Sequence, residues 1–367
     1  MQITAAVAHA AGSPFAIEHL NLEAPRDDEV LVRIVSAGVC HTDLAARDQA
    51  VPVALPIVLG HEGAGVVEAV GSAVTDLAPG DHVVLSFASC GGCPNCAAHL
   101  PCYCTSFMPL NFGGMRRDGS TALSRDGTRV ASHFFGQSSF ASHAVVNARN
   151  AIKVPHEAPL ELLGPLGCGV QTGAGSIMRA LACEAGSALL VLGGGSVGLS
   201  AVLGAVVQGC AQIIVVEPQA GRRALALELG ATHVVDPAAG DVTAAVRAIA
   251  PAGVNYVLDT TGRNAVIAAA VGAMGYGGTL GILAVPASAD DAAVKLDVIA
   301  LLVLGLRVKG ITEGDVDPAR FIPQLVELHL AGRFPFDRLI GKYPLCDINR
   351  AIADQHAGRC VKPVLCP

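Results

Sequence analysis

The chain has 367 residues, a length that accommodates two domains of ordinary size. Apolar residues make up 52% of it and charged residues only 15%, which indicates large buried sheets and excludes a disordered chain. The net charge is −7 and no basic run is present, so neither nucleic acid nor an anionic membrane is an expected partner.

The first part of the chain predicts a small antiparallel β region. Short β-rich runs are separated by turns, and strand-like segments recur as far as residue 146. Residues 88–115 are rich in Cys, Gly, Pro and Asn, which indicates an irregular lobe held together by something other than an apolar core. The predicted strands fall within residues 3–8, 14–22, 29–40, 59–74, 79–84 and 130–146.

From about residue 160 the pattern changes to regular alternation of strands and helices. A helix-like segment at 171–182 leads into this alternation, which predicts a parallel, doubly wound sheet. The apolar run 299–312 suits either a subunit interface or an inner strand. A helix at 318–331 and short strands ending at 362–365 do not continue the alternation, and could fold back on the first domain. The alternating segments are 188–192, 196–208, 213–217, 221–229, 233–235, 241–250, 254–259, 264–274, 278–285 and 306–311.

We therefore expect an α/β protein that combines a doubly wound parallel sheet with a mostly β domain. The β-rich domain should span residues 1–164, including the lobe at 88–115. The doubly wound domain should span 165–312, and a C-terminal segment, 313–367, should return to the first domain.

Residues 188–217 are apolar enough to raise the question of a membrane span. Glycines crowd its first half, no basic flank is present and the period changes at the glycines, so we reject a span. The N-terminus has neither the basic region nor the long apolar core of a signal peptide. Four of the twelve cysteines lie between Cys90 and Cys104, and such clustering favours metal thiolates in a reducing cytoplasm over disulfides.

The strand at 188–192 ends in a glycine turn, Gly193-Gly194-Gly195-Ser196-Val197-Gly198, typical of a dinucleotide site. Gly193 makes the tight turn, Gly195 lets the backbone approach a pyrophosphate, and Gly198 lets the helix lie close to the strand. The N-terminus of that helix offers free N–H groups and a positive dipole end to the phosphates.

Cofactor choice depends on Glu217, which ends the second strand 24 residues after Gly193. An acid at this place accepts hydrogen bonds from the adenosine ribose and repels a 2′-phosphate, which favours NAD. Arg222 and Arg223 follow closely, and they could receive a phosphate if Glu217 were turned away. NADP is therefore the alternative cofactor.

The cysteine lobe has the pattern Cys90-x2-Cys93-x2-Cys96-x7-Cys104. Four thiolates separated by turn residues suit tetrahedral zinc at a closed, structural site. Iron–sulfur ligation also uses short cysteine spacings and is the main rival, whereas free thiols at this density would oxidise. Cys102 is a fifth thiol and leaves the choice of fourth ligand open.

Three scattered residues, Cys40, His61 and Cys168, each lie in a glycine-flanked turn. Two thiolates and an imidazole leave zinc an open position, which is the catalytic arrangement. An alcohol bound there would be acidified, and the alkoxide would donate a hydride to a nicotinamide. Sequence distance alone cannot group these residues, since a lone buried cysteine is usually a small hydrophobic residue.

The pattern Gly60-His61-Glu62-x2-Gly65-x5-Gly71-x2-Val74 resembles the signature of zinc-containing alcohol dehydrogenases of the medium-chain dehydrogenase/reductase superfamily. The cysteine lobe has the spacing of that family, with Cys104 as the fourth ligand. A closer resemblance is to bacterial aryl-alcohol (benzyl alcohol) dehydrogenases, in the segments 135–141, 161–175 and 332–337. The resemblance implies a GroES-like catalytic domain beside a Rossmann domain, with two zinc ions and NAD.

The resemblance also implies roles for individual residues. Thr42 would accept the alcohol proton and pass it to the nicotinamide ribose, Asp43 would orient the ligand histidine, and Glu62 would assist ligand exchange at the metal. Many family members carry a histidine that ends the proton relay where this chain has Ala45, so the proton must leave through water, His41 or another polar group. Further implied roles are catalytic zinc ligation by Cys40, His61 and Cys168, structural zinc ligation by Cys90, Cys93, Cys96 and Cys104, contacts around the nicotinamide by Thr172 and Val197, and a pyrophosphate contact by Lys362. Arg222 is a further candidate for contact with the cofactor.

The predicted function is zinc- and NAD-dependent oxidation of primary aromatic or allylic alcohols to aldehydes, reversibly, in a cytoplasmic homodimer or homotetramer. Alternatives are dehydrogenation of formaldehyde–thiol adducts or terpenoid alcohols, and a non-catalytic NAD(P)-binding protein of the same fold. A zinc-ribbon nucleic-acid binder lacks the necessary basic patch. Six aromatic residues either line an apolar substrate pocket or fill the core. They are Phe87, Phe107, Phe112, Phe134, Phe135 and Phe140.

Overall fold

The computed structural model describes residues 1–286 and 288–367. The chain divides into two compact units by its internal contacts. The first unit comprises residues 1–169, 317–330 and 337–367, and the second comprises residues 170–316 and 331–336. The domain boundaries that the sequence predicts, at 164/165 and 312/313, stay predictions.

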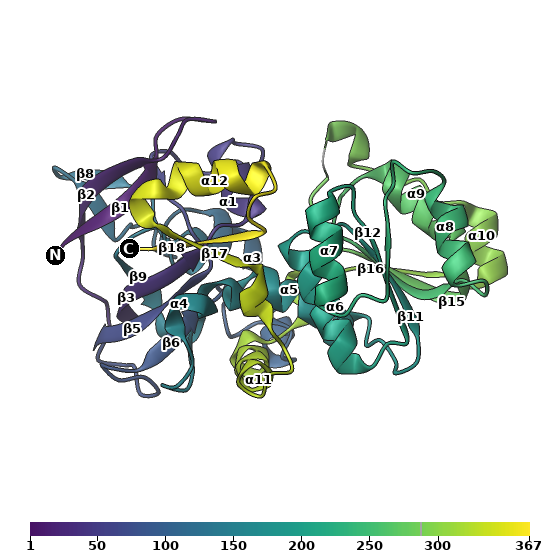
Figure 1. The fold of residues 1–367 in the computed structure, drawn as a ribbon. Coiled ribbons are helices and arrows are strands. Elements are labelled where there is room, and N and C mark those ends of the chain that lie inside the picture. Colours follow the sequence, from purple (N-terminus) through teal and green to yellow (C-terminus); the bar gives the residue numbers. More distant parts are fainter. Residues whose placement is uncertain (287) are drawn as a thin grey trace. The chain divides into compact units, whose positions relative to one another are not determined.

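The first unit is built on two sheets (Figure 1). One has the order β4-β1-β2-β7-β8, and the other has the order β10-β6-β5-β3-β18-β17 with β9 paired to β3. Its strands are β1 Gln2–Ala8, β2 Ala16–Leu22, β3 Glu29–Gly38, β4 Ile57–Val58, β5 Gly63–Val70, β6 His82–Leu85, β7 Leu123–Arg125, β8 Thr128–Val130, β9 His143–Asn147, β10 Ala151–Lys153, β17 Ile340–Pro344 and β18 Lys362–Cys366. Its α-helices are α1 His41–Arg47, α2 Pro94–Ala97, α3 Phe107–Phe112, α4 Leu160–Leu163, α11 Pro318–Leu330 and α12 Ile348–His356.

Strand β3 organises the larger sheet and leads directly to Cys40. It pairs antiparallel with β5 and β9, and near its end with β18, where Ala37 faces Leu365 and Gly38 faces Val364. Helix α12 packs against β17 and β18 and buries Ile348 and Ala351 in the core of this unit. The strand before Cys40 is therefore held on both sides.

The second unit contains a six-stranded parallel sheet of order β13-β12-β11-β14-β15-β16. Helices α6 and α7 cover one face, and α8, α9 and α10 cover the other (Figure 1). The predicted doubly wound, Rossmann-type fold is confirmed, and the strand order reverses at β11. The strands are β11 Ala188–Leu192, β12 Gln212–Val216, β13 His233–Val235, β14 Val254–Asp259, β15 Met274–Ile282 and β16 Arg307–Gly310. The helices are α5 Gly169–Gly175 (beginning at the boundary of the units), α6 Ser196–Gln208, α7 Ala220–Glu228, α8 Val242–Ile249, α9 Asn264–Gly272 and α10 Val298–Leu304.

One of the two alternatives for the run 299–312 is wrong, and one helix near the C-terminus was not predicted. The run 299–312 is not an inner strand, because it begins as α10 and ends as β16 at the sheet edge. Asp297 accepts hydrogen bonds from the backbone N–H groups of Ile299 and Ala300, which starts the helix, and Gly305 ends it with φ +62°. Helix α12 lies where only short strands were expected. Separately, none of the helices in the described residues is long and apolar enough to cross a membrane.

Candidate active site

The glycine turn after β11 has the geometry that its sequence predicts. Gly193 has φ +97°, in the left-handed region that favours glycine. A Cβ on Gly198 would lie 1.9 Å from the Gly193 carbonyl oxygen, so only glycine lets α6 lie this close to the turn. A Cβ on Gly195 would meet no described atom within 4 Å. The turn is thus tightly packed at Gly198 and open at Gly195, where a ligand can approach the backbone.

Glu217 is fixed against this turn. Its side chain is buried, with Oε2 accepting a hydrogen bond of 2.7 Å from the Gly194 N–H and Oε1 accepting one of 2.8 Å from the Gln219 N–H. Arg223 donates to the carbonyl oxygens of Glu217 and Pro218 and pairs with Asp236 at 2.8 Å. Glu217 is therefore turned toward the glycines, and the Arg223 guanidinium is already engaged.

Arg222 and Val197 lie at the surface of the same unit. Both are half-buried, and Arg222 Nε has no hydrogen-bond partner among the described residues. Val197 is in the first turn of α6. Neither placement conflicts with a cofactor contact.

The three predicted catalytic metal ligands converge in the first unit. Cys40 precedes α1, His61 precedes β5, and Cys168 follows a 3₁₀ turn at Gly164–Gly167. Their ligand atoms and a carboxylate oxygen of Glu62 all lie within 4.8 Å of one another. His61 Nε2 is buried and has no hydrogen-bond partner in the described part of the chain. An unpaired imidazole nitrogen beside two thiols is the donor set of a catalytic zinc site, so the residues fit the ion.

Asp43 holds this cluster in place. Its Oδ1 lies 2.8 Å from His61 Nδ1 and accepts the Gly60 N–H at 3.0 Å, while its Oδ2 accepts the Cys40 N–H at 3.0 Å. With Nδ1 donating to Asp43, Nε2 presents its lone pair to the cluster. Burial alone would lower the pKa of His61, but the Asp43 carboxylate outweighs it and holds that pKa well above its usual value. A metal ion would replace a proton at Nε2.

The thiol of Cys40 is poised to ionise. Hydrogen bonding with the Cys168 thiol holds the pKa of Cys40 well below its usual value, and burial opposes this effect. The nearby positive charges of His61 and Lys362 lower the pKa further. A thiolate is the form that binds metal.

Lys362 is buried beside the cluster and forms an ion pair with Glu62. Its ammonium donates to Glu62 Oε1 at 2.9 Å, to Glu62 Oε2 at 2.8 Å and to the Val39 carbonyl oxygen at 3.2 Å. Glu62 Oε1 also accepts the Gly169 N–H at 2.9 Å. Burial raises the pKa of Glu62, and the positive charge of Lys362 works against that rise. Sequence reasoning missed this pair, and the predicted pyrophosphate contact of Lys362 stays a prediction.

The hydroxyl of Thr42 lies near the first ligand, with its Oγ1 3.8 Å from Cys40 Sγ. His41 is exposed, and Ala45 is buried. Thr172 belongs to the second unit, where its hydroxyl donates to Glu313 Oε2 at 3.3 Å. Of the predicted catalytic and nicotinamide residues, the structure therefore brings Thr42, Asp43 and Glu62 to the metal cluster.

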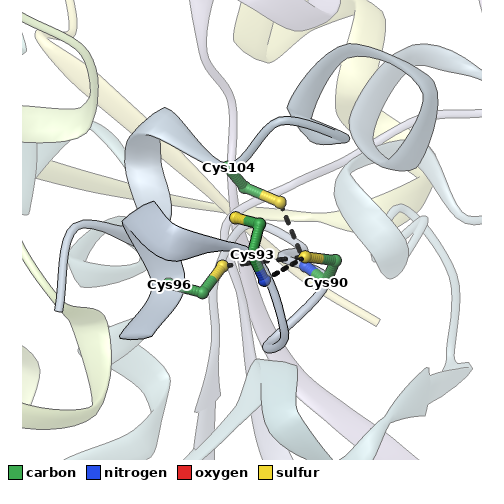
Figure 2. A group of neighbouring side chains, drawn as sticks. All are labelled: Cys90, Cys93, Cys96 and Cys104. Atoms are coloured by element: carbon green, nitrogen blue, oxygen red, sulfur yellow. Dashed lines mark hydrogen bonds between the residues drawn. The ribbon is translucent and has the colours of Figure 1, made fainter. Parts of the chain in front are cut away.

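The four lobe cysteines form a second cluster, with their sulfur atoms pointing toward one another (Figure 2). Cys90 Sγ and Cys96 Sγ are 4.0 Å apart, and zinc–sulfur bonds of about 2.3 Å in a tetrahedron would place sulfurs about 3.8 Å apart. Hydrogen bonds from backbone N–H groups, first that of Cys96, lower the pKa of Cys93 to about 5. Cys102 packs in the apolar core instead, which makes Cys104 the fourth member.

Aromatic rings pack against His61. The ring centre of Phe135 is 4.5 Å from that of His61, and the ring centre of Phe134 is 5.6 Å away. Phe87, Phe134, Phe135 and Phe140 are buried in the core, whereas Phe107 and Phe112 are half-buried. Four of the six rings are therefore part of the core, and which of them also line a substrate pocket stays a prediction.

Gln137 is a further residue that sequence reasoning missed. Its amide donates to the His61 carbonyl oxygen at 2.9 Å and accepts the Gly63 N–H at 3.0 Å. It thereby fixes the backbone on which the ligand histidine is mounted. Gln137 lies within the segment 135–141, and the resemblance of that segment to aryl-alcohol dehydrogenases was the one feature of the sequence that could have indicated it.

Comparisons with known proteins cover nearly the whole chain. Residues 26–156 match the family model of the alcohol dehydrogenase GroES-like domain, and residues 196–330 match that of the zinc-binding dehydrogenases. The chain is 52% identical to a geraniol dehydrogenase of Castellaniella defragrans, over 98% of this chain and 96% of that protein.

Solved structures show the same likeness. A zinc-binding alcohol dehydrogenase domain protein from Burkholderia ambifaria has a TM-score of 0.98 at 54% identity, covering 100% of this chain and 99% of that one. A benzyl alcohol dehydrogenase from Acinetobacter calcoaceticus has a TM-score of 0.96 at 44% identity, with the same coverage. The described zinc-binding relatives favour zinc over an iron–sulfur cluster in the lobe.

Proposed function

Since the chain belongs to the zinc-containing alcohol dehydrogenases of the medium-chain dehydrogenase/reductase superfamily, we propose that it transfers a hydride between a primary aromatic or allylic alcohol and NAD. The reverse reaction reduces the aldehyde. The observation that carries the proposal is the convergence of Cys40, His61 and Cys168 around the unpaired His61 Nε2.

Each residue around this cluster has a separate role in the proposed reaction. Zinc, when bound, would supply the Lewis acidity that favours loss of the alcohol proton. Asp43 keeps His61 in the tautomer that binds metal, and Thr42 is the proposed proton acceptor, 3.8 Å from Cys40 Sγ. Ala45 offers no proton-accepting group, so we assign onward transfer to solvent, which exposed His41 can contact.

NAD is the proposed cofactor because of Glu217. Its carboxylate lies against the glycine turn, where it would bind the adenosine ribose hydroxyls and repel a 2′-phosphate. A related solved structure of a zinc-binding dehydrogenase from Sinorhizobium meliloti, 27% identical, is bound to NADP, so NADP is the cofactor to compare. The buried Glu217 favours NAD in this chain.

The proposed substrate class rests on two relatives that are named for different kinds of alcohol. Geraniol is an allylic alcohol and benzyl alcohol is an aromatic one, and the relatives named for them are 52% and 44% identical to this chain. Both alcohols carry the reacting carbon next to an unsaturated carbon, and both give conjugated aldehydes. Terpenoid alcohols therefore belong to the proposed substrates.

The test is NADH formation with benzyl, cinnamyl, terpenoid and short aliphatic alcohols, repeated with NADP. We expect the first three classes to react with NAD at far higher kcat/KM than aliphatic alcohols or any alcohol with NADP. Cys168→Ala should abolish turnover while NADH still binds, and Thr42→Ser should retain more activity than Thr42→Ala. An absence of turnover on every alcohol by zinc-replete protein would refute the proposal.

We also propose that the protein is a homo-oligomer in a reducing compartment such as the cytoplasm. Helix α10 exposes Val298, Ile299, Leu302 and Val303, each more than 60% accessible, beside the edge strand β16. An apolar helix next to an unpaired strand edge is the kind of surface that a second copy covers. All twelve cysteines are free thiols, which fits the reducing compartment.

A further inference from the structure

We infer that Glu313 is a positioning residue for the nicotinamide end of the cofactor, and that its charge favours the oxidised form. The inference rests on the proposed function, because it takes Thr172 as a nicotinamide neighbour. No sequence motif singled out Glu313, and the contacts of its side chain carry the argument.

The carboxylate of Glu313 binds two side chains of α5. Its Oε2 accepts hydrogen bonds from Thr172 Oγ1 and from Gln171 Nε2, each at 3.3 Å. Thr172 is 8% exposed and Gln171 is fully buried, so both donors have little access to solvent. Because Thr172 gives its only hydroxyl hydrogen to Glu313, it can meet a ligand only as an acceptor. The carboxamide of nicotinamide carries N–H donors that suit such an acceptor.

The backbone around Glu313 is strained and firmly held. Glu313, Gly314 and Asp315 have φ values of +51°, +72° and +55°, in the left-handed region that non-glycine residues rarely adopt. Lys309 pairs with Asp315 at 2.7 Å and donates to the Ala180 carbonyl oxygen at 2.8 Å. A Cβ on Gly314 would lie 2.8 Å from the Gln171 carbonyl oxygen. The turn is thus pressed against α5, and strain of this kind concentrates at functional sites.

The charge of Glu313 distinguishes the two redox states of the cofactor. The nicotinamide ring is positively charged in NAD⁺ and neutral in NADH. Glu313 is half-buried and bonded to Thr172, so with Thr172 against the ring its carboxylate stabilises bound NAD⁺ more than bound NADH. The hydrogen bonds from Thr172 and Gln171 to Glu313, in contrast, support the binding of NAD⁺ and NADH equally.

Two substitutions separate these effects. Glu313→Gln keeps an acceptor for Thr172 and removes the charge, so we expect the Kd of NAD⁺ to rise about five-fold with little change for NADH. Glu313→Ala removes both the acceptor and the charge, and it should weaken the binding of NAD⁺ and of NADH. Calorimetry measures NAD⁺ binding, and protein-to-NADH fluorescence transfer measures NADH binding.

Asp315→Asn is the matched control, since it breaks the pair with Lys309 in the same turn but leaves Glu313 intact. It should lower the melting temperature without changing the ratio of the two Kd values. The inference would be overturned if Glu313→Gln left the ratio of the NAD⁺ and NADH Kd values as in the wild type. It would also be overturned if Asp315→Asn changed that ratio as much as Glu313→Gln does. Failure of the wild type to oxidise alcohols would refute the proposed substrates instead, and the Kd ratio would still decide the role of Glu313.

Discussion

At the scale of single residues, Gly195 and Gly198 differ in what an added methyl group would meet. We expect Gly198→Ala to lower the free energy of unfolding by about 2–3 kcal/mol, because the new Cβ would overlap the Gly193 carbonyl oxygen. Gly195→Ala should unfold like the wild type but bind NADH about tenfold more weakly, since the methyl group would keep the pyrophosphate from the backbone.

Urea denaturation and NADH titration of the two variants check this contrast. The assignment of the turn to the pyrophosphate fails if Gly195→Ala binds NADH as the wild type does. The packing argument fails if both variants unfold alike.

Glu29 and Arg116 form a buried ion pair outside the active site. Arg116 Nε lies 2.6 Å from Glu29 Oε1, and a second guanidinium nitrogen donates to Oε2 at 3.0 Å. Burial alone would raise the pKa of Glu29, but His133, whose Nε2 lies 3.8 Å away, and Arg116 lower it to about 2. A lowered pKa stabilises the fold above the unfolded value of 4.5, and that stability is lost as the pH falls toward 2.

Glu29→Gln should therefore destabilise the protein by about 3 kcal/mol at neutral pH, because it removes the buried partner of Arg116 and leaves only the exposed Glu23, 2.8 Å from its guanidinium. The difference from the wild type should shrink between about pH 4.5 and 2, where Glu29 becomes protonated in the wild type too. Urea denaturation at a series of pH values measures it. A difference that is constant with pH would contradict the assigned pKa.

How far single residues can be predicted from sequence depends on the range of their contacts. Gly193 and Gly198 act on their own turn, and the motif predicted their geometry. Lys362 and Glu62 lie 300 residues apart in sequence, and no local pattern indicates that they pair. Asp43 was expected to orient His61 only through resemblance, and its contact also depends on the tertiary fold.

At the scale of elements, the cysteine lobe has little apolar core and should depend on its metal. We expect Cys90→Ser to reduce the zinc content from two ions per chain to one and to make the lobe sensitive to protease. Cys102→Ala is the control, since Cys102 lies outside the cluster, and it should keep two ions. Atomic absorption measures the content, and two ions in Cys90→Ser would refute the four-cysteine site.

Elements with a clear period were predictable, and short or capped ones were not. β11, α6, β13 and β14 have the predicted bounds because their apolar runs end at glycine turns or charged residues. Helix α10 was missed because its residues are apolar on all sides and show no helical period, so that only Asp297 and Gly305 at its two ends indicate it. Helix α12 is amphipathic, but only Ile348, Ala351 and Ile352 of its nine residues are buried, and this stripe is too short to indicate a helix from the sequence alone.

At the scale of the whole molecule, the exposed face of α10 gives the assembly prediction. Leu302 is 73% exposed, so Leu302→Glu costs the isolated chain little. We expect it to convert the oligomer into monomers of unchanged melting behaviour at high dilution, as measured by light scattering after size exclusion. Glu327→Ala on α11 is a surface control that should keep the native mass. An unchanged mass for Leu302→Glu would place the interface elsewhere.

The pairing of β3 with β18 bears on how the chain is made. Val364 and Leu365 face Gly38 and Ala37, and Lys362 reaches the carbonyl oxygen of Val39 beside the first metal ligand. During translation, the ribosome releases β3 more than 300 residues before β18 emerges. The members of the metal cluster are all translated by residue 168, but the Lys362 ammonium that pairs with Glu62 follows only with β18. A nascent chain that stops before β18 therefore leaves Glu62 without its buried cation beside the metal ligands.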